Sequence, residues 1–276
     1  MQIVSFNING IRARLHQLEA LVAKYRPDVI GLQETKVSDE EFPLEAVTAL
    51  GYRAEFYGQK GHYGVALLSR RPALEVVKGL PDDPEEAQRR VVFAAYPMTD
   101  GGRLWVANAY WPQGEDRQHP VKFPAKERFY KDLGRYLAEQ FSPDDRLILM
   151  GDANVALTDG DIGIGDDNAR RWLRSGKCSF LPEERQWLQG LLDWGLQDTF
   201  RVLHPEVSDR FSWFDYRSRG FERVPPRGLR IDVMLATSPL TAVLQGAGID
   251  YELRGMERPS DHCPVWSDFG LEIAQD

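Results

Sequence analysis

Four acidic residues and one histidine, spread along the chain beside short apolar runs, are the residues best suited to chemistry. Asp261 and His262 are neighbours near the end of the sequence, just before the apolar run at residues 265–269. If a strand opens with this pair, the two side chains lie on opposite faces of its pleat, where a metal and a substrate can share them. The other acids each adjoin an apolar run of their own: Glu34, Asp152 and Asp232. Polar groups that follow buried strands collect at one rim of a sheet, so we expect one site there.

The ligand types favour a magnesium site. Carboxylate oxygens are hard ligands that suit Mg²⁺, which keeps several waters and uses one or two protein carboxylates. The sequence lacks the Cys and His spacing of a zinc site. A lone carboxylate after a strand, such as Glu34, is more commonly a surface residue or a helix cap. The other three acids, which also lie beside apolar runs, favour a metal-binding role for Glu34. We therefore expect Mg²⁺ as the cofactor, with Mn²⁺ as a substitute for it.

Two groups in this set have both an ordinary and a catalytic interpretation. Gly151-Asp152-Ala153-Asn154 is typical of an Asx turn after a strand; alternatively, Asp152 acts as a general base on water and Asn154 orients the water or a phosphate. His262 is either a buried, hydrogen-bonded histidine or a donor to a phosphoryl oxygen, with Asp232 orienting its other ring nitrogen. The residues alone leave these alternatives open.

Two basic stretches favour a nucleic-acid partner although the net charge is −8. Residues 168–177 contain four basic residues and no acid, and residues 210–230 contain six arginines against two acids. The second stretch also contains Ser212-Trp213-Phe214-Asp215-Tyr216. Aromatic rings stack on bases or wedge between them while arginines hold phosphates. The alternative is a core aromatic cluster with solvated charged flanks.

The bulk composition is that of a globular protein. The chain has 276 residues, of which 42% are hydrophobic and 28% charged, and no apolar run reaches the ~18 residues of a membrane helix. We therefore expect no membrane partner. The first residues, 1–6, read as a strand without a basic leader, so no signal peptide is predicted. Two cysteines, Cys178 and Cys263, are too few for a disulfide framework and fit a reducing cytoplasm.

Periodicity and turn residues predict a single α/β domain over residues 1–276. Helical spacing of apolar residues predicts helices at 12–25, 43–50, 124–141 and 182–194. Apolar runs predict strands at 2–8, 29–33, 52–57, 63–69, 74–78, 90–96, 104–110, 147–151, 231–236 and 262–269. Strands outnumber helices and several are joined by short turns, which favours mixed sheets. Two such sheets packed face to face, with helices outside, would bury residues 147–150 on both sides.

Several motifs together carry a resemblance that covers nearly the whole chain. They are Asn7–Gly10, Leu32–Lys36, Gly61–Ala66, Gly151–Asn154, Asp209–Trp213 and Ser260–Val265, with Lys122–Lys126 and Trp172–Arg174 as further matching segments. With these motifs the chain resembles the exonuclease III family of abasic-site endonucleases. The motif positions show no departure from the family pattern, and Ala153 stands where family members vary.

The resemblance implies a four-layer α/β sandwich, with the site at one rim between its two mixed sheets. It implies Mg²⁺-dependent hydrolysis of duplex DNA on the 5′ side of an abasic site, which leaves a 3′-hydroxyl. It also implies 3′→5′ exonuclease activity and removal of 3′-blocking groups. The expected partner is duplex DNA with an abasic site or a blocked 3′ end, bound by a monomer in the cytoplasm.

The resemblance also assigns roles to individual residues. It implies that Glu34 is the principal metal ligand, with Asn9 and Asp261 nearby. It implies a catalytic group that handles the nucleophile and the scissile phosphate, in which Asp232 pairs with His262: Asn7, Tyr110, Asp152, Asn154, Asp232 and His262. Aromatic and apolar residues would line the pocket for the extruded deoxyribose: Trp213, Phe214, Leu229 and Ile231. Polar and basic residues would hold the strand: Gln113, Lys122, Arg90 and Arg230. Extrusion is least costly where no base is stacked, which favours abasic sites.

Two rival functions follow from the same residues. A phosphoesterase of the wider superfamily would act on inositol phosphates or phospholipids, but the aromatic and basic stretch at 210–230 disfavours it. A DNA-binding module without catalysis would have no need of the full set of acids with His262. Whether one or two metals act, and whether Asp152 or His262 is the base, the residues leave open.

Overall fold

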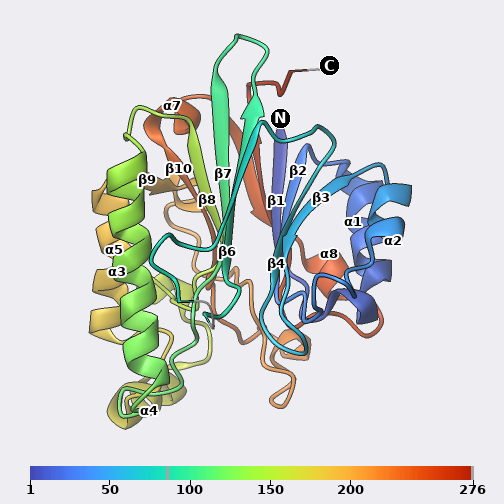
Figure 1. Ribbon diagram of the computed structural model, residues 1–276. Helices are drawn as coiled ribbons and strands as arrows, with labels where there is room; N and C mark the ends of the chain where they lie inside the picture. Colours follow the sequence, from blue (N-terminus) through green and yellow to red (C-terminus); the bar gives the residue numbers. More distant parts are fainter. Residues whose placement is uncertain (85–86, 275–276) are drawn as a thin grey trace.

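The computed structural model describes residues 1–84 and 87–274. Within these residues twelve strands form two six-stranded sheets that face each other, with helices on both outer sides (Figure 1). The predicted four-layer α/β sandwich with two mixed sheets is therefore confirmed. In the described part of the chain, no helix has both the length and the apolar character needed to cross a membrane.

The first sheet has the strand order β11-β12-β1-β2-β4-β3. Its strands are β1 (Gln2–Asn7), β2 (Val29–Gln33), β3 (Arg53–Tyr57), β4 (Val65–Ser69), β11 (Leu244–Ile249) and β12 (Val265–Phe269). Strands β1 and β2 are parallel, and their register pairs Asn7 with Gln33. Asn7 and the residue after Gln33, Glu34, therefore emerge at the same rim. The helices α1 (Leu15–Tyr25) and α2 (Leu44–Ala49) cover the outer face (Figure 1).

The second sheet has the strand order β5-β6-β7-β8-β10-β9. Its strands are β5 (Glu75–Lys78), β6 (Val91–Pro97), β7 (Arg103–Tyr110), β8 (Leu147–Asp152), β9 (Leu196–Asp198) and β10 (Asp232–Thr237). The register places Tyr110 opposite Asp152 and Asp152 opposite Asp232, so three polar side chains stand in one row. The helices α3 (Lys122–Gln140) and α5 (Pro182–Asp193) cover the outer face (Figure 1).

The core lies in three layers, one between the sheets and one beneath each pair of helices. In β8, Leu147 and Leu149 pack under α3 and α5, whereas Ile148 and Met150 pack against the other sheet. This strand is thus buried on both faces, as predicted for residues 147–150. The shorter elements connect these layers: α4 (Asp166–Ser175), α6 (Thr199–Leu203), α7 (Ser238–Thr241), α8 (Tyr251–Arg254) and the 3-10 turns Ile11–Ala13, Asp159–Asp161 and Gly220–Glu222.

A polar contact joins the two sheets close to the rim. The Asn108 amide nitrogen donates to the carbonyls of Leu32 and Ala66, each at 2.9 Å, and its oxygen accepts from Gln33 at 2.6 Å. A Cβ at Gly31 would lie 2.5 Å from the Met150 methyl and 2.9 Å from the Asn108 amide. A larger residue would displace these two side chains, so Gly31 allows the sheets to approach closely beneath the site.

The strand expected at 262–269 begins only at Val265, so Asp261 and His262 lie in the preceding loop. Pro264 has no backbone N–H to donate to a sheet. The neighbouring amides bond elsewhere: His262 N donates to Ser260 Oγ at 3.2 Å and Cys263 N donates to the Ser212 carbonyl at 2.7 Å. The pair is therefore positioned by loop contacts rather than by a pleat.

Other boundaries shift for identifiable reasons. Helix α3 begins at Lys122, before the predicted start at Pro124, because proline is tolerated in a first helical turn. Residues 12–25 divide into a 3-10 turn and α1. Several elements were not predicted: α4, α6, α7, α8, β9 and β11. Helix α4 has only ten residues, and its apolar side chains, Ala169, Trp172 and Leu173, cover about one turn between charged residues, so its periodicity was too short to stand out.

Candidate active site

A cavity of about 380 Å³ opens at the rim where β1, β2, β7, β8 and β10 present their polar residues. Both sheets contribute to it, because Glu34 follows β2 whereas Tyr110 and Asp152 end β7 and β8. The full lining is Glu34, Tyr110, Gln113, Asp152, Asn154, Trp172, Lys177, Ser179, Trp213, Asp215, Arg217, Ile231, Asp261 and His262. Most of the polar residues expected from the sequence therefore converge on one space.

His262 is held between two carboxylates. Its Nδ1 lies 2.8 and 3.0 Å from the two carboxylate oxygens of Asp232, and its Nε2 lies 3.7 Å from Asp152 Oδ2. Burial alone would lower the pKa of His262, but the charges of Asp232 and Asp152 outweigh it and raise that pKa well above its ordinary value. The two neighbouring carboxylates therefore favour the protonated ring. With Nδ1–H directed to Asp232, Nε2–H is a donor turned toward the cavity.

Asn7 links the two carboxylates that belong to different sheets. Its amide nitrogen lies 2.9 Å from Glu34 Oε1 and 2.9 Å from Asp152 Oδ2. Burial raises the pKa of Asp152, and the nearby charges of Asp232 and Glu34 add to the shift while His262 opposes it. A carboxylate with a raised pKa is a better proton acceptor near neutral pH.

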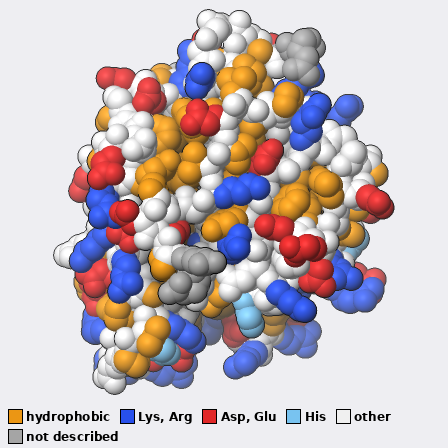
Figure 2. Space-filling model, viewed as in Figure 1, with side chains coloured by type: hydrophobic (Ala, Val, Ile, Leu, Met, Phe, Trp, Pro, Cys, Tyr) orange, Lys and Arg blue, Asp and Glu red, His pale blue; other side chains and the backbone are white. Residues whose placement is uncertain are grey.

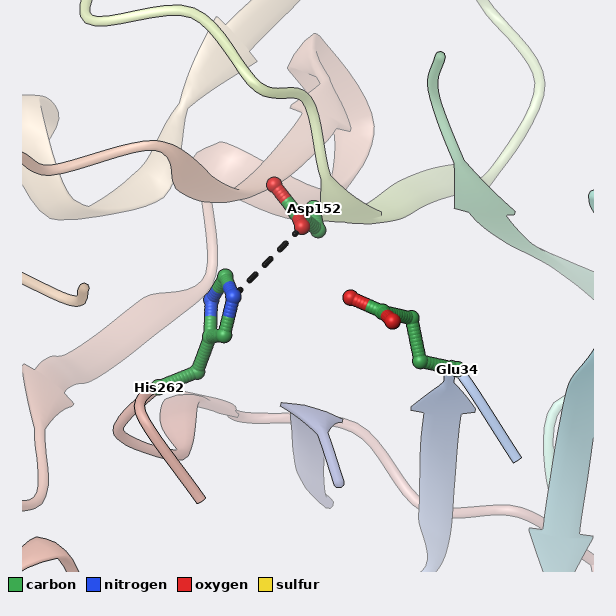
Figure 3. Close-up of side chains that lie close together, drawn as sticks. All are labelled: Glu34, Asp152 and His262. Atoms are coloured by element: carbon green, nitrogen blue, oxygen red, sulfur yellow. Dashed lines mark ion pairs between the residues drawn. The ribbon is translucent and has the colours of Figure 1, made fainter. Parts of the chain in front are cut away.

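Glu34, Asp152 and His262 form the group best arranged to hold a cation. The side chains point toward one another from the loop after β2, from β8 and from the loop before β12 (Figure 3). One ligand atom from each lies within 4.8 Å of the others. The two carboxylates in this group supply hard oxygen donors, which fit Mg²⁺. The residues therefore fit the expected metal.

Asn9 and Asp261, the other expected ligands, make a neighbouring set of contacts. The Asn9 amide donates to Asp261 Oδ1 at 2.8 Å, and the other Asp261 oxygen accepts from Trp213 Nε1 at 3.0 Å. Lys36 Nζ donates to Asn9 Oδ1 at 2.5 Å and lies 2.9 Å from Glu34 Oε2. The cation group identified by geometry includes Glu34 but not Asp261.

Tyr110 is oriented by Arg90 at the side of the cavity. The Arg90 guanidinium lies 4.8 Å from the centroid of the Tyr110 ring and 4.3 Å from that of Tyr63, and it donates to the Tyr110 carbonyl at 3.0 Å. Burial raises the pKa of Tyr110 well above its ordinary value, with Glu34 and Asp152 contributing. Its hydroxyl is therefore a donor beside Glu34. Arg90 itself is buried under the two rings.

The expected pocket residues divide into two sets. Trp213 and Ile231 line the cavity, whereas Phe214 and Leu229 are fully buried in neighbouring clusters. The guanidinium of Arg230 lies 2.6 Å from both Asp161 and Asp198, inside the protein, rather than in the cavity. Of the strand-binding candidates, Gln113 faces the cavity. Lys122 is exposed and pairs with Glu115.

The sequence interpretation did not assign cavity roles to several lining residues. Lys177 Nζ lies 3.8 Å from the centroid of the Trp172 ring, and both reach the cavity from the end of α4 and the turn after it. Asp215 and Arg217 come from the aromatic stretch, and Ser179 follows α4. The acid-free basic run at 168–177 was the available signal. It predicted a charged surface but not which of its residues would face inward.

Glu34 and Asn154 are among the non-glycine residues of the site that have left-handed backbones. Glu34 has φ 51° and Asn154 has φ 53°. This conformation is uncommon outside glycine and costs roughly 1 kcal/mol or more, so surrounding contacts must hold it. The Glu34 carbonyl accepts from Gly10 at 2.7 Å, and the Asn154 amide nitrogen donates to the Trp111 carbonyl at 2.9 Å.

The comparisons with known proteins agree with this architecture. Residues 4–262 match the Endonuclease/Exonuclease/phosphatase family. The chain is 54% identical over 269 residues to exodeoxyribonuclease III of Haemophilus influenzae, covering 98% of this chain and 100% of that relative.

Solved structures are similar over the whole fold. An AP endonuclease from Archaeoglobus fulgidus superposes with a TM-score of 0.88 at 31% identity, covering 98% of this chain and 99% of that one. A 3′ phosphatase from Neisseria, bound to a product DNA hairpin, has a TM-score of 0.86 at 38% identity with the same coverage. Because the match extends over the described sheets and the residues that converge between them, this chain belongs to the Endonuclease/Exonuclease/phosphatase family.

Proposed function

We propose that this DNA repair nuclease hydrolyses the phosphodiester on the 5′ side of an abasic site in duplex DNA, leaving a 3′-hydroxyl. We propose further that it removes nucleotides and blocking groups from 3′ ends. The supporting observation is the convergence of Glu34, Asp152 and His262 within 4.8 Å, beside a cavity with an aromatic wall. The names of the relatives, an exodeoxyribonuclease, an AP endonuclease and a 3′ phosphatase, support the same activities.

Each catalytic residue has a role that its contacts support. Glu34, with Asp152 beside it, would hold a divalent cation, Mg²⁺ in our proposal, which supplies positive charge against the charge that develops on phosphate oxygens. His262, oriented by Asp232, donates from Nε2 to a phosphoryl oxygen. Asp152 accepts a proton from the attacking water or aligns it. Asn7, Asn154 and Tyr110 orient the water and the phosphate.

The cavity also supports selectivity for abasic sites. Trp213 and Ile231 form an apolar wall, while Lys177 and Arg217 bring positive charge to the same space. A deoxyribose without a base enters such a pocket without the cost of unstacking a base. Gln113 lies where it can contact the strand beside the extruded sugar. Recognition would thus combine a fitted sugar pocket with phosphate-binding cations.

We propose that residues 1–276 act as one catalytic unit and as a monomer. The support is that both sheets contribute to one cavity, Glu34 from the first and Asp152 from the second. Cys178 and Cys263 are both buried free thiols, which supports a reducing cytoplasmic setting.

A cleavage assay on a duplex with one abasic site tests the proposed function. We expect incision with Mg²⁺ and none with EDTA. Asp152→Asn should retain binding to the duplex but lose turnover by roughly 10²- to 10⁴-fold, because a neutral amide cannot accept the proton. Asp144→Asn is the matched control, since Asp144 is exposed just before the opposite end of β8.

Two outcomes would contradict the proposal. An unchanged rate for Asp152→Asn would remove that residue from the mechanism. Cleavage of inositol polyphosphates with no incision of the abasic duplex would assign the chain to another substrate class within the family.

A further inference from the structure

Behind the wall of the reaction cavity lies a buried ion pair that the proposed chemistry does not use. Lys126, in the second turn of α3, and Glu184, in the first turn of α5, are both fully buried, and the Lys126 Nζ lies 2.5 Å from Glu184 Oε1. Buried ion pairs seldom add stability relative to apolar residues of similar size. The other contacts of Lys126 and Glu184 therefore indicate a role for the pair other than stability.

The Lys126 ammonium binds the backbone of two segments that carry site residues. Nζ donates to the Asn154 carbonyl at 2.9 Å and to the Gln113 carbonyl at 3.2 Å. Gln113 follows β7 and Asn154 follows β8, and both side chains face the cavity. Three hydrogen bonds satisfy the three donors of the ammonium. A lysine at this position thus fixes both segments at once.

Glu184 extends the same arrangement to a third segment. Its Oε2 accepts from the backbone nitrogens of Ser179 and Leu181, each at 2.8 Å. Ser179 also lines the cavity. The pair therefore connects three separate stretches of chain that form one wall of the cavity, although neither charged group reaches that cavity itself.

We propose that Lys126 is a positioning residue for the reaction, acting through Asn154 and Gln113 with Glu184 as its buried counter-ion. Asn154 has a left-handed backbone, with φ 53°, and its carbonyl is the group that Lys126 binds. Without that donor the segment relaxes, and the Asn154 amide leaves the position that the chemistry needs. The inference depends on the proposed function for its rate measurement.

The test replaces the pair without leaving a buried charge. Lys126→Met with Glu184→Gln keeps the volumes and an acceptor for Ser179 and Leu181, so the double variant should fold, with a Tm lowered by several degrees because two carbonyls lose their donor. On the abasic duplex, kcat should fall about 10- to 100-fold with KM changed by less than about threefold, as when a supporting partner of an active residue is lost. The control is the exposed pair on the same helix, Lys131→Met with Glu127→Gln, which should leave kcat unchanged.

A mutant cycle separates positioning from a general structural effect. Asn154→Ala removes the side chain through which Lys126 acts, so adding the Lys126 and Glu184 substitutions to it should cost less than about threefold further. A fully additive loss, or a wild-type kcat in the double variant, would overturn the inference.

A second readout does not depend on cleavage. Cys178 is buried next to Gly114 and Lys126, since a Cβ built on Gly114 would lie 2.8 Å from the Cys178 sulfur and 3.0 Å from Lys126 Cδ. In the double variant the native-state labelling rate of Cys178 by a thiol reagent should rise about tenfold or more through local opening, with Cys263 unchanged. An unchanged Cys178 rate would overturn the inference. Failure of the wild-type protein to cut abasic DNA would instead contradict the proposed function.

Discussion

His262 shows how the role of one side chain is set by groups on other elements. The sequence suggested Asp232 as its partner, and the structure has that contact at 2.8 Å. Asp152 on the opposite side of the ring makes the protonated form favourable. Asp232 and Asp152 are both far from His262 in sequence. The sequence could suggest the pair of Asp232 and His262, but it gave no sign that Asp152 lies on the other side of the ring and favours its charged form.

Trp213 is expected to govern selectivity rather than the chemistry itself. Its ring walls the cavity and its Nε1 donates to Asp261 at 3.0 Å. Trp213→Ala should lower kcat/KM for incision at an abasic site by about tenfold or more, and lower 3′ exonuclease activity less, because the proposed sugar pocket would lose its aromatic wall.

Paired assays on duplexes of the same sequence, with and without the abasic site, measure this difference. Trp213→Phe is the control, since it keeps a ring but removes the N–H donor. Equal losses on the two substrates would argue against a specificity role for the ring.

At the scale of elements, most of the strands were predictable, although β9 and β11 were missed, and the loops around the site were not predictable. Apolar runs such as that of β8 mark buried strands because no polar residue interrupts them. Arg230 shows the limit of this reasoning. It stands between Leu229 and Ile231 in a basic stretch that suggests DNA contact, yet its guanidinium is enclosed by two acids from distant segments.

The Asp161–Arg230 pair should make stability depend on pH. Burial alone would raise the pKa of Asp161, but Arg230 and Arg201 outweigh it and hold that pKa below its ordinary value. The unfolded state therefore binds the proton more tightly. The stabilisation is fully present above the unfolded pKa of about 4 and is lost as the pH falls through the folded pKa.

Asp161→Asn should accordingly destabilise the protein by about 3 kcal/mol at pH 7, the lower end for a broken buried ion pair, because Asp198 still faces the Arg230 guanidinium. The free energy of unfolding, from urea titrations at pH 7 and at successively lower pH, should show the difference from wild type shrinking below about pH 4. A difference that stays constant with pH would contradict this account. Asp167→Asn, at a fully exposed side chain, is the control.

For the molecule as a whole, composition and strand spacing predicted two sheets packed face to face. They did not predict which site residues of the two sheets lie close together, which only the structure shows. Asn7 and Glu34 belong to one sheet, Asp152 and Asp232 to the other. Their side chains meet because Asn108 and Gly31 fix the distance between the sheets. A single sequence contains no direct signal for that distance, and only the resemblance pointed to it.

DNA binding by a chain of net charge −8 should depend on a confined basic patch. Acidic and basic side chains are interspersed over the face in Figure 2. Lys177 and Arg217 line the cavity together with one acid of the same region, Asp215. Replacing both with glutamine should reduce the slope of log K against log salt by about 2.

The slope is measured as duplex affinity from about 50 to 200 mM salt, with EDTA present to prevent cleavage. Lys131→Gln on the exposed side of α3 should leave the slope unchanged. A double variant with the wild-type slope would mean that these two cations do not contact the phosphate backbone.

The division of the catalytic groups between the sheets also matters while the ribosome makes the chain. Glu34 is translated first and Asp152 much later, and His262 arrives only with β12, the antiparallel partner of β1. A polypeptide interrupted before residue 262 lacks both the imidazole and a central strand of the first sheet. A truncated translation product is therefore expected to lack the proposed cleavage activity, which the chain can acquire only after β12 has been made.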